Sequence, residues 1–305
     1  MYNLKNKPIV AGIIISYQPS IDDLYLSIKN LTKEVDIIIL VENGSDKYTQ
    51  NKIKDIVKDN KIDLLIQDTN QGLGFAQNIG IQHGLKKKAK YFLFLDDDSI
   101  LTKGSTKQLI LELESNPNLG LAACNIIHKD SNKIQKYWIK TKFFYKRISF
   151  SEKEEKFQNV NTVISSGSMI PRKVIEQCGL FREDYFIDYI DIEYNLRIRS
   201  NGYTITVIRN AELLHKLGNT KSIQIRRLLE IHPTFHNPSR RFFMIRNRIW
   251  TWKIYMLTFP GWFLIDFSNF IFDNMRVLLF ENNKLENLIQ IFRGIKAGFS
   301  KIEKN

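Results

Sequence analysis

The stretch KYFLFLDDDSIL, residues 90–101, joins an apolar and aromatic run to three adjacent aspartates. Residues 91–95 have the length and composition of a buried strand, and the aspartates follow where that strand ends. Neighbouring carboxylates repel one another unless a positive charge lies among them. The stretch therefore predicts a sheet strand whose carboxyl end lies beside something positively charged.

The first hundred residues alternate short apolar runs with helix-like stretches. We predict strands over residues 8–17, 35–45, 62–70 and 90–99, and helices over residues 20–33, 49–60 and 72–88. The alternation predicts an α/β fold with a mostly parallel sheet that helices cover on both faces. Ligands bind such sheets beyond the carboxyl ends of the strands, and the polar segments SYQPS, VENGSD and LDDDS fall at those ends.

The composition favours a globular protein with an anionic partner. The chain has 305 residues, of which 43% are hydrophobic, and its formal net charge is +13. The spacing of the two cysteines, Cys124 and Cys178, argues against a zinc site or a disulfide framework and favours a reducing compartment. The apolar run near the N-terminus is short and lacks a cleavage pattern, so we interpret it as a core strand rather than a signal peptide.

The three aspartates allow two interpretations. The D-x-D spacing brings Asp96 and Asp98 to one side of the chain, where carboxylate oxygens suit Mg²⁺ or Mn²⁺ together with substrate phosphates. Alternatively, Asp97, Asp98 and Ser99 form only a helix cap or a turn. Two metal-dependent chemistries use this pattern: nucleotide-sugar transfer, and phosphoryl hydrolysis of the haloacid dehalogenase type, in which the first aspartate is the nucleophile. The later part of the chain must decide between them.

A second acidic motif lies in residues 179–203, GLFREDYFIDYIDIEYNLRIRSNGY. We predict a helix that holds Asp188 and Asp191 in its first turn and ends at Gly202. Such carboxylates are either caps or, where a sugar hydroxyl must lose its proton as it attacks, a general base. Further along, His215 follows another predicted strand and is either structural or, with an acidic motif upstream, a metal ligand.

Taken in order, these motifs resemble glycosyltransferase family 2, the inverting enzymes of the GT-A fold, and most of all its bacterial rhamnosyltransferase branch. The matching segments, from Ile13 to about Asn247, are IIISYQPS, VENGSD, NQGLGFAQNIGI, LFLDDDS, SSGSMIPR, FREDYFIDYIDIEYNLRIRSNGY, HKLGN and RFFMIRN. The resemblance implies a Rossmann-like catalytic domain, Mg²⁺ or Mn²⁺, a dTDP- or UDP-linked sugar donor and a saccharide acceptor. It points to L-rhamnose from dTDP-rhamnose, with UDP-hexoses as the alternative, in bacterial cell-surface polysaccharide synthesis.

The resemblance also implies a role for each matching position on the donor side. It assigns donor-nucleotide contacts to Tyr17, Pro19, Glu42, Asn43, Asn70, Gly72, Asn78 and Asp96. Glu42 departs from the family, because most members carry there an aspartate that reads the pyrimidine ring. Gln77 stands where many relatives carry an arginine, which weakens any role of this position in neutralising phosphate.

On the metal and acceptor side, the resemblance implies that Asp98 and His215 bind the metal and that Asp96 faces the ribose or the metal. Asp191 matches the catalytic base, and Ile190 replaces the glutamate that usually precedes it. The acceptor and sugar side comprises Gly167, Ser168, Asp188 and Arg197. The phosphohydrolase alternative loses support, because no lysine and acidic pair stands out in the later context that it requires.

The composition changes again near residue 236. We therefore predict a catalytic domain over residues 1–235 and a basic, aromatic, amphipathic helical extension over residues 236–305. The uncharged run IYMLTFPGWFLI has twelve residues, too few to span a bilayer, which needs about 20. Beyond it, a narrow polar stripe on an otherwise apolar helix comprises Asp266, Asn269, Asp273 and Arg276.

This pattern suits a helix at an anionic membrane surface, with Trp and Phe immersed and cations at the headgroups. The alternative is packing on the catalytic domain or on a second subunit, which would make a homodimer through the C-terminal helices. No recognised nucleic-acid motif accompanies the cations, so nucleic acid is not expected as a partner. We expect a cytoplasmic protein, peripheral at the inner face of the cell membrane, with a lipid-linked acceptor.

Overall fold

The computed structural model describes residues 9–58, 62–129, 131–141, 145–151, 153–216, 223–225, 229–231, 238–280 and 283–300. The chain divides into two compact units. Unit 1 comprises Met1–Phe186 and Ile190–Lys216, and unit 2 comprises Ile187–Tyr189 and Leu217–Asn305. The predicted boundary between residues 235 and 236 lies outside the described residues. Three residues of the second acidic motif thus belong to unit 2.

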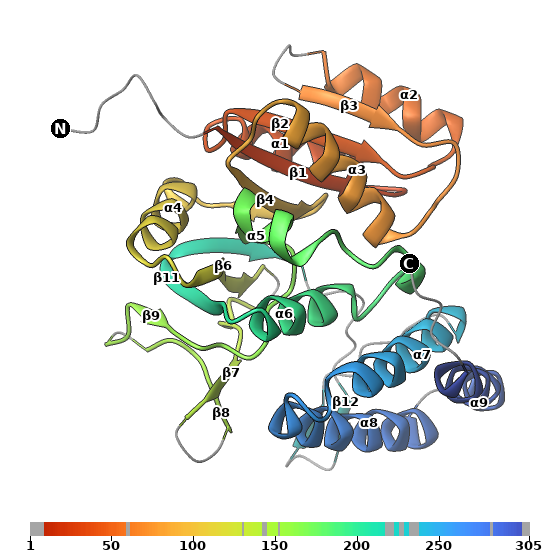
Figure 1. Cartoon of the computed structure of the whole chain (residues 1–305). Coiled ribbons are helices and arrows are strands. Elements are labelled where there is room, and N and C mark those ends of the chain that lie inside the picture. Colours follow the sequence, from red (N-terminus) through yellow and green to blue (C-terminus); the bar gives the residue numbers. More distant parts are fainter. Residues whose placement is uncertain are drawn as a thin grey trace. The chain divides into compact units, whose positions relative to one another are not determined.

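Unit 1 is built on a nine-stranded sheet with the order β3-β2-β1-β4-β10-β6-β11-β5, in which β9 also pairs with β11 (Figure 1). Its strands are β1 (Val10–Ser16), β2 (Ile37–Glu42), β3 (Ile62–Ile66), β4 (Tyr91–Asp96), β5 (Ile100–Leu101), β6 (Leu119–His128), β9 (Lys156–Phe157), β10 (Ser168–Pro171) and β11 (Thr204–His215). Strands β3, β2, β1 and β4 are parallel, and so are β6 and β11, whereas β10 runs antiparallel between β4 and β6. A separate hairpin pairs β7 (Tyr137–Lys140) with β8 (Tyr145–Ile148). The predicted mostly parallel α/β sheet and its four early strands are confirmed.

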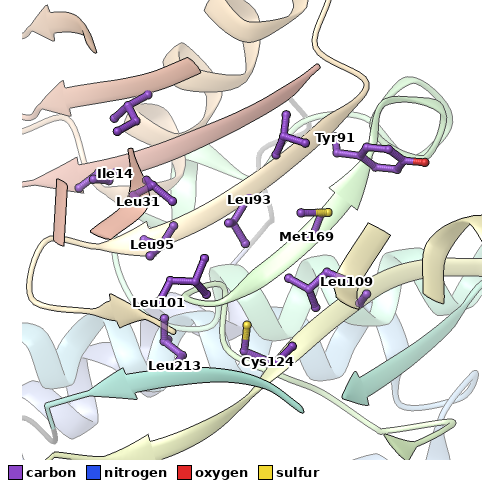
Figure 2. Close-up of a cluster of buried hydrophobic side chains, with 14 of the residues drawn as sticks. Ile14, Leu31, Tyr91, Leu93, Leu95, Leu101, Leu109, Cys124, Met169 and Leu213 are labelled. Atoms are coloured by element: carbon purple, nitrogen blue, oxygen red, sulfur yellow. The ribbon is translucent and has the colours of Figure 1, made fainter. Parts of the chain in front are cut away.

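Helices cover both faces of this sheet. They are α1 (Ile21–Leu31), α2 (Lys47–Ile56), α3 (Leu73–Lys86), α4 (Ser105–Ser115), α5 (Arg172–Cys178) and α6 (Ile190–Ser200), with a short 3-10 turn, η2 (Glu183–Tyr185). On one face, Leu93 and Leu95 of β4 pack with Leu31 of α1 and Leu109 of α4 (Figure 2). Since side chains alternate along a strand, Phe92 points to the opposite face, where it lies against Gly84 of α3. The three predicted early helices are confirmed.

The helix of the second acidic motif begins later than predicted. Phe186, Asp188 and Tyr189 have φ values of 61°, 63° and 64°, and an α-helix cannot contain these left-handed conformations. Helix α6 therefore starts at Ile190, so Asp188 lies outside it and Asp191 lies in its first turn. The helix ends before Gly202, whose φ is 86°, as predicted.

The described residues of unit 2 form three long helices and a short pair of antiparallel strands. The strands are β12 (Ile223–Ile225) and β13 (Leu229–Ile231), and the helices are α7 (Pro238–Tyr255), α8 (Pro260–Phe280) and α9 (Lys284–Phe299). Helices α7 and α9 approach closely, because a Cβ atom at Gly298 would lie 2.7 Å from the Cβ of Ile249. None of the described helices is both long enough and apolar enough to cross a membrane.

The inward faces of these helices differ from the prediction. Asp266 and Asp273, two of the polar-stripe residues, face Arg248 of α7 at 3.3 and 3.2 Å. The indole rings of Trp250 and Trp252 are buried, so the expectation that tryptophans enter a membrane is wrong for both. The exposed apolar side chains of α8 and α9 are instead Leu264, Phe267, Ile271, Phe272, Met275, Leu279, Leu285, Ile289, Phe292 and Phe299.

Candidate active site

The carboxyl ends of β1, β2 and β4 lie at one edge of the sheet in unit 1. Ile15 of β1 pairs with Asp96, the last residue of β4, and Ser16 pairs with Glu42, the last residue of β2. Parallel strands in this register end at the same level, so the polar segments that follow them gather there. The register confirms that the predicted polar segments follow strands that end at one edge of the sheet, and the position of the site there stays a prediction.

Asp96, Asp98 and His215 come together at this edge. One potential ligand atom from each residue lies within 4.8 Å of the others. The Nδ1 atom of His215 is 3.9 Å from Oδ2 of Asp96 and 3.7 Å from Oδ1 of Asp98. His215 reaches the cluster because it is the last residue of β11, far along the chain from β4. The tertiary fold thus assembles the three residues that the resemblance had assigned to a metal.

The chemistry of this cluster fits a divalent cation. Two carboxylates and one imidazole supply oxygen and nitrogen ligands of the kind that Mn²⁺ and Mg²⁺ accept alongside phosphate oxygens. The Oδ1 atom of Asp98 is buried and has no hydrogen-bond partner among the described residues. A buried carboxylate oxygen without a donor is costly, and a bound cation would remove that cost.

Burial and neighbouring carboxylates raise the pKa values of Asp96 and Asp97. Burial, more than the neighbouring carboxylates, raises the pKa of Asp97 to about 7, and Asp98 and Asp96 add to the effect. Burial also raises the pKa of Asp96, although the nearby His215 opposes the shift. The cluster therefore gathers more carboxylates than its protein surroundings neutralise, which favours the binding of a cation.

Sequence reasoning missed a chain of hydroxyl groups that holds the cluster. The Oγ atom of Ser166 accepts the backbone N–H of Asp96 at 3.0 Å and lies 3.1 Å from Oγ of Ser99. Ser99 Oγ in turn lies 2.9 Å from Nδ1 of His215. The signal was present in the motifs LDDDS and SSGS, but only the folded chain brings these serines together.

Lys129 is a second residue that the motifs did not indicate. Its Nζ donates to the backbone carbonyl of Asp98 at 2.6 Å, and its backbone N–H donates to the carbonyl of His215. The ammonium group of Lys129, the residue that follows β6, thus lies beside the cluster of Asp96, Asp98 and His215.

Gly167 and Ser168, assigned to the acceptor side, shape the turn behind this cluster. Gly167 has a φ of 78°, its N–H donates to the carbonyl of Phe94, and its carbonyl accepts the N–H of Cys124. The buried hydroxyl of Ser168 donates to the carbonyl of Ser165. Both residues therefore support the strands from which the cluster projects.

Tyr17 and Pro19 lie in the loop that joins β1 to α1. The backbone N–H of Tyr17 donates to the carboxylate of Asp97. The ring of Tyr17 is 49% exposed, and Pro19 is half-buried. An aromatic face is therefore open to solvent next to the aspartate cluster.

Glu42, Asn43 and Asn70 form a connected network after β2. Glu42 is fully buried, and its carboxylate accepts the N–H of Ser45 at 2.6 Å and the amide of Gln50 at 2.9 Å. Asn43 donates to the Asn70 side chain at 3.1 Å, and the Asn70 oxygen accepts the N–H of Gly72. These side chains hold the loop that precedes α3.

Gly72 and Asn78 of this region contact the segment that leads into the second acidic motif. A Cβ atom at Gly72, where φ is 93°, would lie 2.7 Å from the carbonyl oxygen of Phe186. Asn78 is buried, and its amide donates to the Phe181 carbonyl at 2.9 Å and to Glu183 at 2.8 Å. The side chain of Asn78, predicted to line the nucleotide, therefore fastens the 181–183 segment onto α3.

The second acidic motif separates into three different environments. Asp191 lies at the start of α6, where its Oδ1 accepts the N–H of Ile192 at 2.8 Å. Arg197, assigned to the acceptor side, pairs with the buried Glu193 and donates to the carbonyls of Cys178 and Leu180. Its guanidinium therefore links α6 to the segment around residues 178–180, within unit 1.

Asp188, also assigned to the acceptor side, belongs to unit 2. Its two carboxylate oxygens accept Nε and Nη2 of Arg240, both at 2.9 Å. This two-point pairing also raises the pKa of the Arg240 guanidinium.

Comparison with known proteins agrees with this geometry. The model of the Glycosyl transferase family 2 matches residues 13–179. The chain is 30% identical over 239 residues to the "dTDP-rhamnosyl transferase RfbF" of Shigella flexneri, which covers 78% of each chain. It is 22% identical over 211 residues to the "Low-salt glycan biosynthesis hexosyltransferase Agl10" of Haloferax volcanii, which covers 65% of this chain and 68% of the relative.

Two solved structures share the fold. One is GalNAc-T7 with UDP, GalNAc and Mn²⁺, with a TM-score of 0.63 at 13% identity over 84% of this chain and 50% of the other. The second is the mannosyltransferase PcManGT from Pyrobaculum calidifontis with GDP-Man and Mn²⁺, with a TM-score of 0.55 at 12% identity. That match covers 82% of this chain and 64% of the other, so the chain spans about half to two thirds of these structures' length.

Proposed function

The chain belongs to glycosyltransferase family 2, and we propose that it transfers L-rhamnose from dTDP-rhamnose to a saccharide hydroxyl with inversion. The cluster of Asp96, Asp98 and His215 at the sheet edge carries the proposal, because it gives this chain a place to hold the charged half of a nucleotide sugar. The relative from Shigella flexneri supports rhamnose as the sugar. The family match leaves no support for the phosphohydrolase alternative.

Asp96, Asp98 and His215 would hold Mn²⁺ or Mg²⁺. A divalent ion bound there would offset the charge of the nucleoside diphosphate as it leaves. Lys129 adds a positive charge beside Asp98, whose backbone carbonyl its Nζ contacts. The exposed ring of Tyr17 provides a surface on which the pyrimidine can stack. Residues 1–235 would thus supply the donor site.

We assign the proton transfer to Asp191. Its carboxylate lies in the first turn of α6, where the helix dipole favours the charged form, and the charged form is the one that can accept a proton. It would take the proton of the acceptor hydroxyl as that oxygen attacks the anomeric carbon from the face opposite the leaving diphosphate. One base and one displacement give inversion.

The donor can be tested with the full chain and a panel of nucleotide sugars. We expect dTDP-rhamnose with Mn²⁺ or Mg²⁺ to give the fastest release of nucleoside diphosphate, and EDTA to abolish it. Asp191→Asn should abolish transfer but leave nucleotide binding nearly unchanged, because the base is not needed to hold the donor. Transfer by Asp191→Asn would show that the base is misassigned.

A UDP-hexose is the second candidate donor, and the hexosyltransferase relative from Haloferax volcanii favours it. In the same panel, faster turnover with a UDP-hexose than with dTDP-rhamnose would replace rhamnose as the sugar while leaving the reaction class intact. If the protein binds nucleotide sugars in a metal-dependent way but turns over none of them, it is a binding protein and not a transferase.

We further propose that unit 2 docks on an anionic membrane surface and that the acceptor is lipid-linked, which implies a peripheral protein at the inner face of the cell membrane. On α9, the exposed apolar residues Leu285 and Phe292 lie near the exposed cations Lys284 and Arg293. Apolar side chains flanked by cations suit the boundary between headgroups and acyl chains.

Vesicle flotation tests this surface. Leu285→Glu combined with Phe292→Glu should abolish binding to vesicles that contain anionic lipid. Leu111→Glu, which alters an exposed leucine on α4 of unit 1, should bind like the wild type. Equal vesicle binding by the wild type, the double variant and Leu111→Glu would overturn membrane docking. Membrane docking would also be overturned if the wild type forms dimers that the double variant does not form, and α9 would then belong to a homodimer interface.

A further inference from the structure

The segment Ile187–Tyr189 is bound by the C-terminal helices through both its backbone and its side chains. Asn247 of α7, which is fully buried, donates to the carbonyls of Ile187 at 2.8 Å and Asp188 at 2.9 Å. Arg240, seven residues earlier and so on the same helix face, pairs with the carboxylate of Asp188. Three residues of chain are thus held at several points from a single helix face.

Tyr189 anchors the segment in a buried ionic network. Its hydroxyl donates to Asp266 at 2.8 Å and accepts Nε of Arg248. Arg248 lies between Asp266 and Asp273, and Trp252 donates its indole N–H to Asp266 at 2.7 Å. Tyr189, Arg248 and Asp266 are each less than 9% exposed. Every charge in this network has a partner, so the network holds one geometry.

The backbone of the same segment is in an unfavourable conformation. Phe186, Asp188 and Tyr189 have positive φ values of 61° to 64°, although none of them is glycine. Residues keep such conformations only where their surroundings fix them, and these places are often functional. In this chain Asn247, Arg240 and the Tyr189 network provide the fixing contacts for Asp188 and Tyr189.

Asp191 follows Tyr189 by two residues and lies in the first turn of α6. Tyr189 is joined directly to Ile190, the first residue of α6, so the contacts that fix the backbone of Tyr189 act on the point at which the helix begins. We propose that Tyr189, Asn247 and Arg248 are positioning residues that fix the start of α6 and thereby aim Asp191 at the acceptor hydroxyl. This inference rests on the proposed function, since it assigns the base to Asp191.

The test compares two substitutions that each remove one buried tyrosine hydroxyl. Tyr189→Phe removes the hydroxyl between Arg248 and Asp266, and Tyr255→Phe removes one from the end of α7. Misplacing a reacting group by about 1 Å costs up to about 100-fold in rate, so kcat of Tyr189→Phe should fall about 10- to 100-fold. Its KM for the donor and its nucleotide affinity should stay near those of the wild type. Tyr255→Phe should keep its kcat.

Hydrogen exchange supplies a second measurement that does not depend on turnover. Amides 190–194 should exchange faster in Tyr189→Phe than in the wild type, whereas amides of α3 should not change. Arg248→Lys, which keeps the charge but loses the planar fork, should show the same pattern. If the wild type transfers no sugar, the proposed function fails, and exchange at residues 190–194 still decides the positioning role.

Two results would overturn the proposal. One is unchanged exchange at residues 190–194 in both Tyr189→Phe and Arg248→Lys. The other is an equal fall in kcat, nucleotide affinity and melting temperature in Tyr189→Phe and Tyr255→Phe, because that would indicate a general loss of stability.

Discussion

Two groups of charged side chains in this molecule are built in opposite ways. At the sheet edge of unit 1, Asp96, Asp97 and Asp98 face one another with one imidazole nearby, and a buried oxygen of Asp98 has no partner among the described residues. In unit 2, Arg248 lies between two carboxylates, and Asp266 accepts hydrogen bonds from Tyr189 and Trp252. The first group has more carboxylates than cations beside it and is suited to bind a ligand. The second is complete and is suited to hold a fixed geometry.

Removing a carboxylate from the first group gives the largest expected effect. Asp98→Asn should lower the rate of sugar transfer by about 10²- to 10³-fold, because the developing charge on the diphosphate loses its metal-held partner. Isothermal titration with nucleotide and Mn²⁺ should show the matching loss of metal-dependent binding. Asp97→Asn, the same substitution at the neighbouring residue, is the control and should keep most of the activity. An equal loss in both variants would remove the distinction between the two aspartates.

Breaking the second group should affect stability more than binding. Arg248→Met leaves Asp266 buried without its cation and should lower the free energy of unfolding by about 3–5 kcal/mol, measured by urea denaturation. Burial raises the pKa of Asp266 and Arg248 opposes the shift, so this pKa rises further in the variant. A group with a raised folded-state pKa is stabilising at low pH and loses that contribution as pH rises. The deficit should therefore be smaller at pH 5 than at pH 8; a pH-independent deficit would argue against a charged Asp266.

A smaller effect is expected at the rim of the first group. Tyr17→Ala should weaken the affinity for the donor nucleotide about 10-fold, since base stacking on an aromatic ring contributes about 1–3 kcal/mol. Tyr25→Ala is the matched control, because Tyr25 is equally exposed but lies on α1. If both variants bind the nucleotide like the wild type, Tyr17 does not contact the base.

The smallest effect tests the charge repulsion itself. Asp97→Asn should raise the melting temperature of the metal-free protein by about 2–4 °C at pH 8, and the gain should shrink as the pH falls below 7 and vanish near the ordinary pKa of 3.8. Burial and the two neighbouring carboxylates raise the pKa of Asp97 to about 7. Between pH 3.8 and 7 the native state keeps a proton that the unfolded chain has lost, so the stability of the native state declines over that range and is lowest above pH 7.

Asp63 provides the opposite sign for the same substitution. Burial would raise the pKa of Asp63, but His83 and Lys87 together lower it, so its carboxylate stabilises the fold above its unfolded pKa. Asp63→Asn should therefore lower the melting temperature at pH 8. A rise in both variants would mean that charge removal is generally stabilising in this basic protein and not specific to the cluster.

The sequence by itself determined the sheet, the edge at which its polar segments gather, and Asp96, Asp98 and His215 as candidate ligands there. Buried parallel strands are continuous apolar runs, so their ends are visible wherever the first polar residues appear, as at Glu42 and Asp96. The order of the motifs also linked Asp98 to His215, although His215 lies 116 positions after Ser99, the residue next to Asp98. The strand ends are local features of the chain, and the motifs follow one another in a fixed order. Both kinds of feature can be recognised in a sequence without coordinates.

Only the tertiary structure decided which polar atoms of the predicted site residues remain available to bind a ligand. Asn78 and Arg197 match the family's positions, yet contacts inside unit 1 use their polar groups, whereas Ser99 and Ser166 line the cluster without having been selected. The contacts that place Asp188 in unit 2 come from Arg240 and Asn247, residues about 50 to 60 positions later. Pairings between distant side chains leave no periodic signal, because each depends on where two separate elements come to lie once the core has packed.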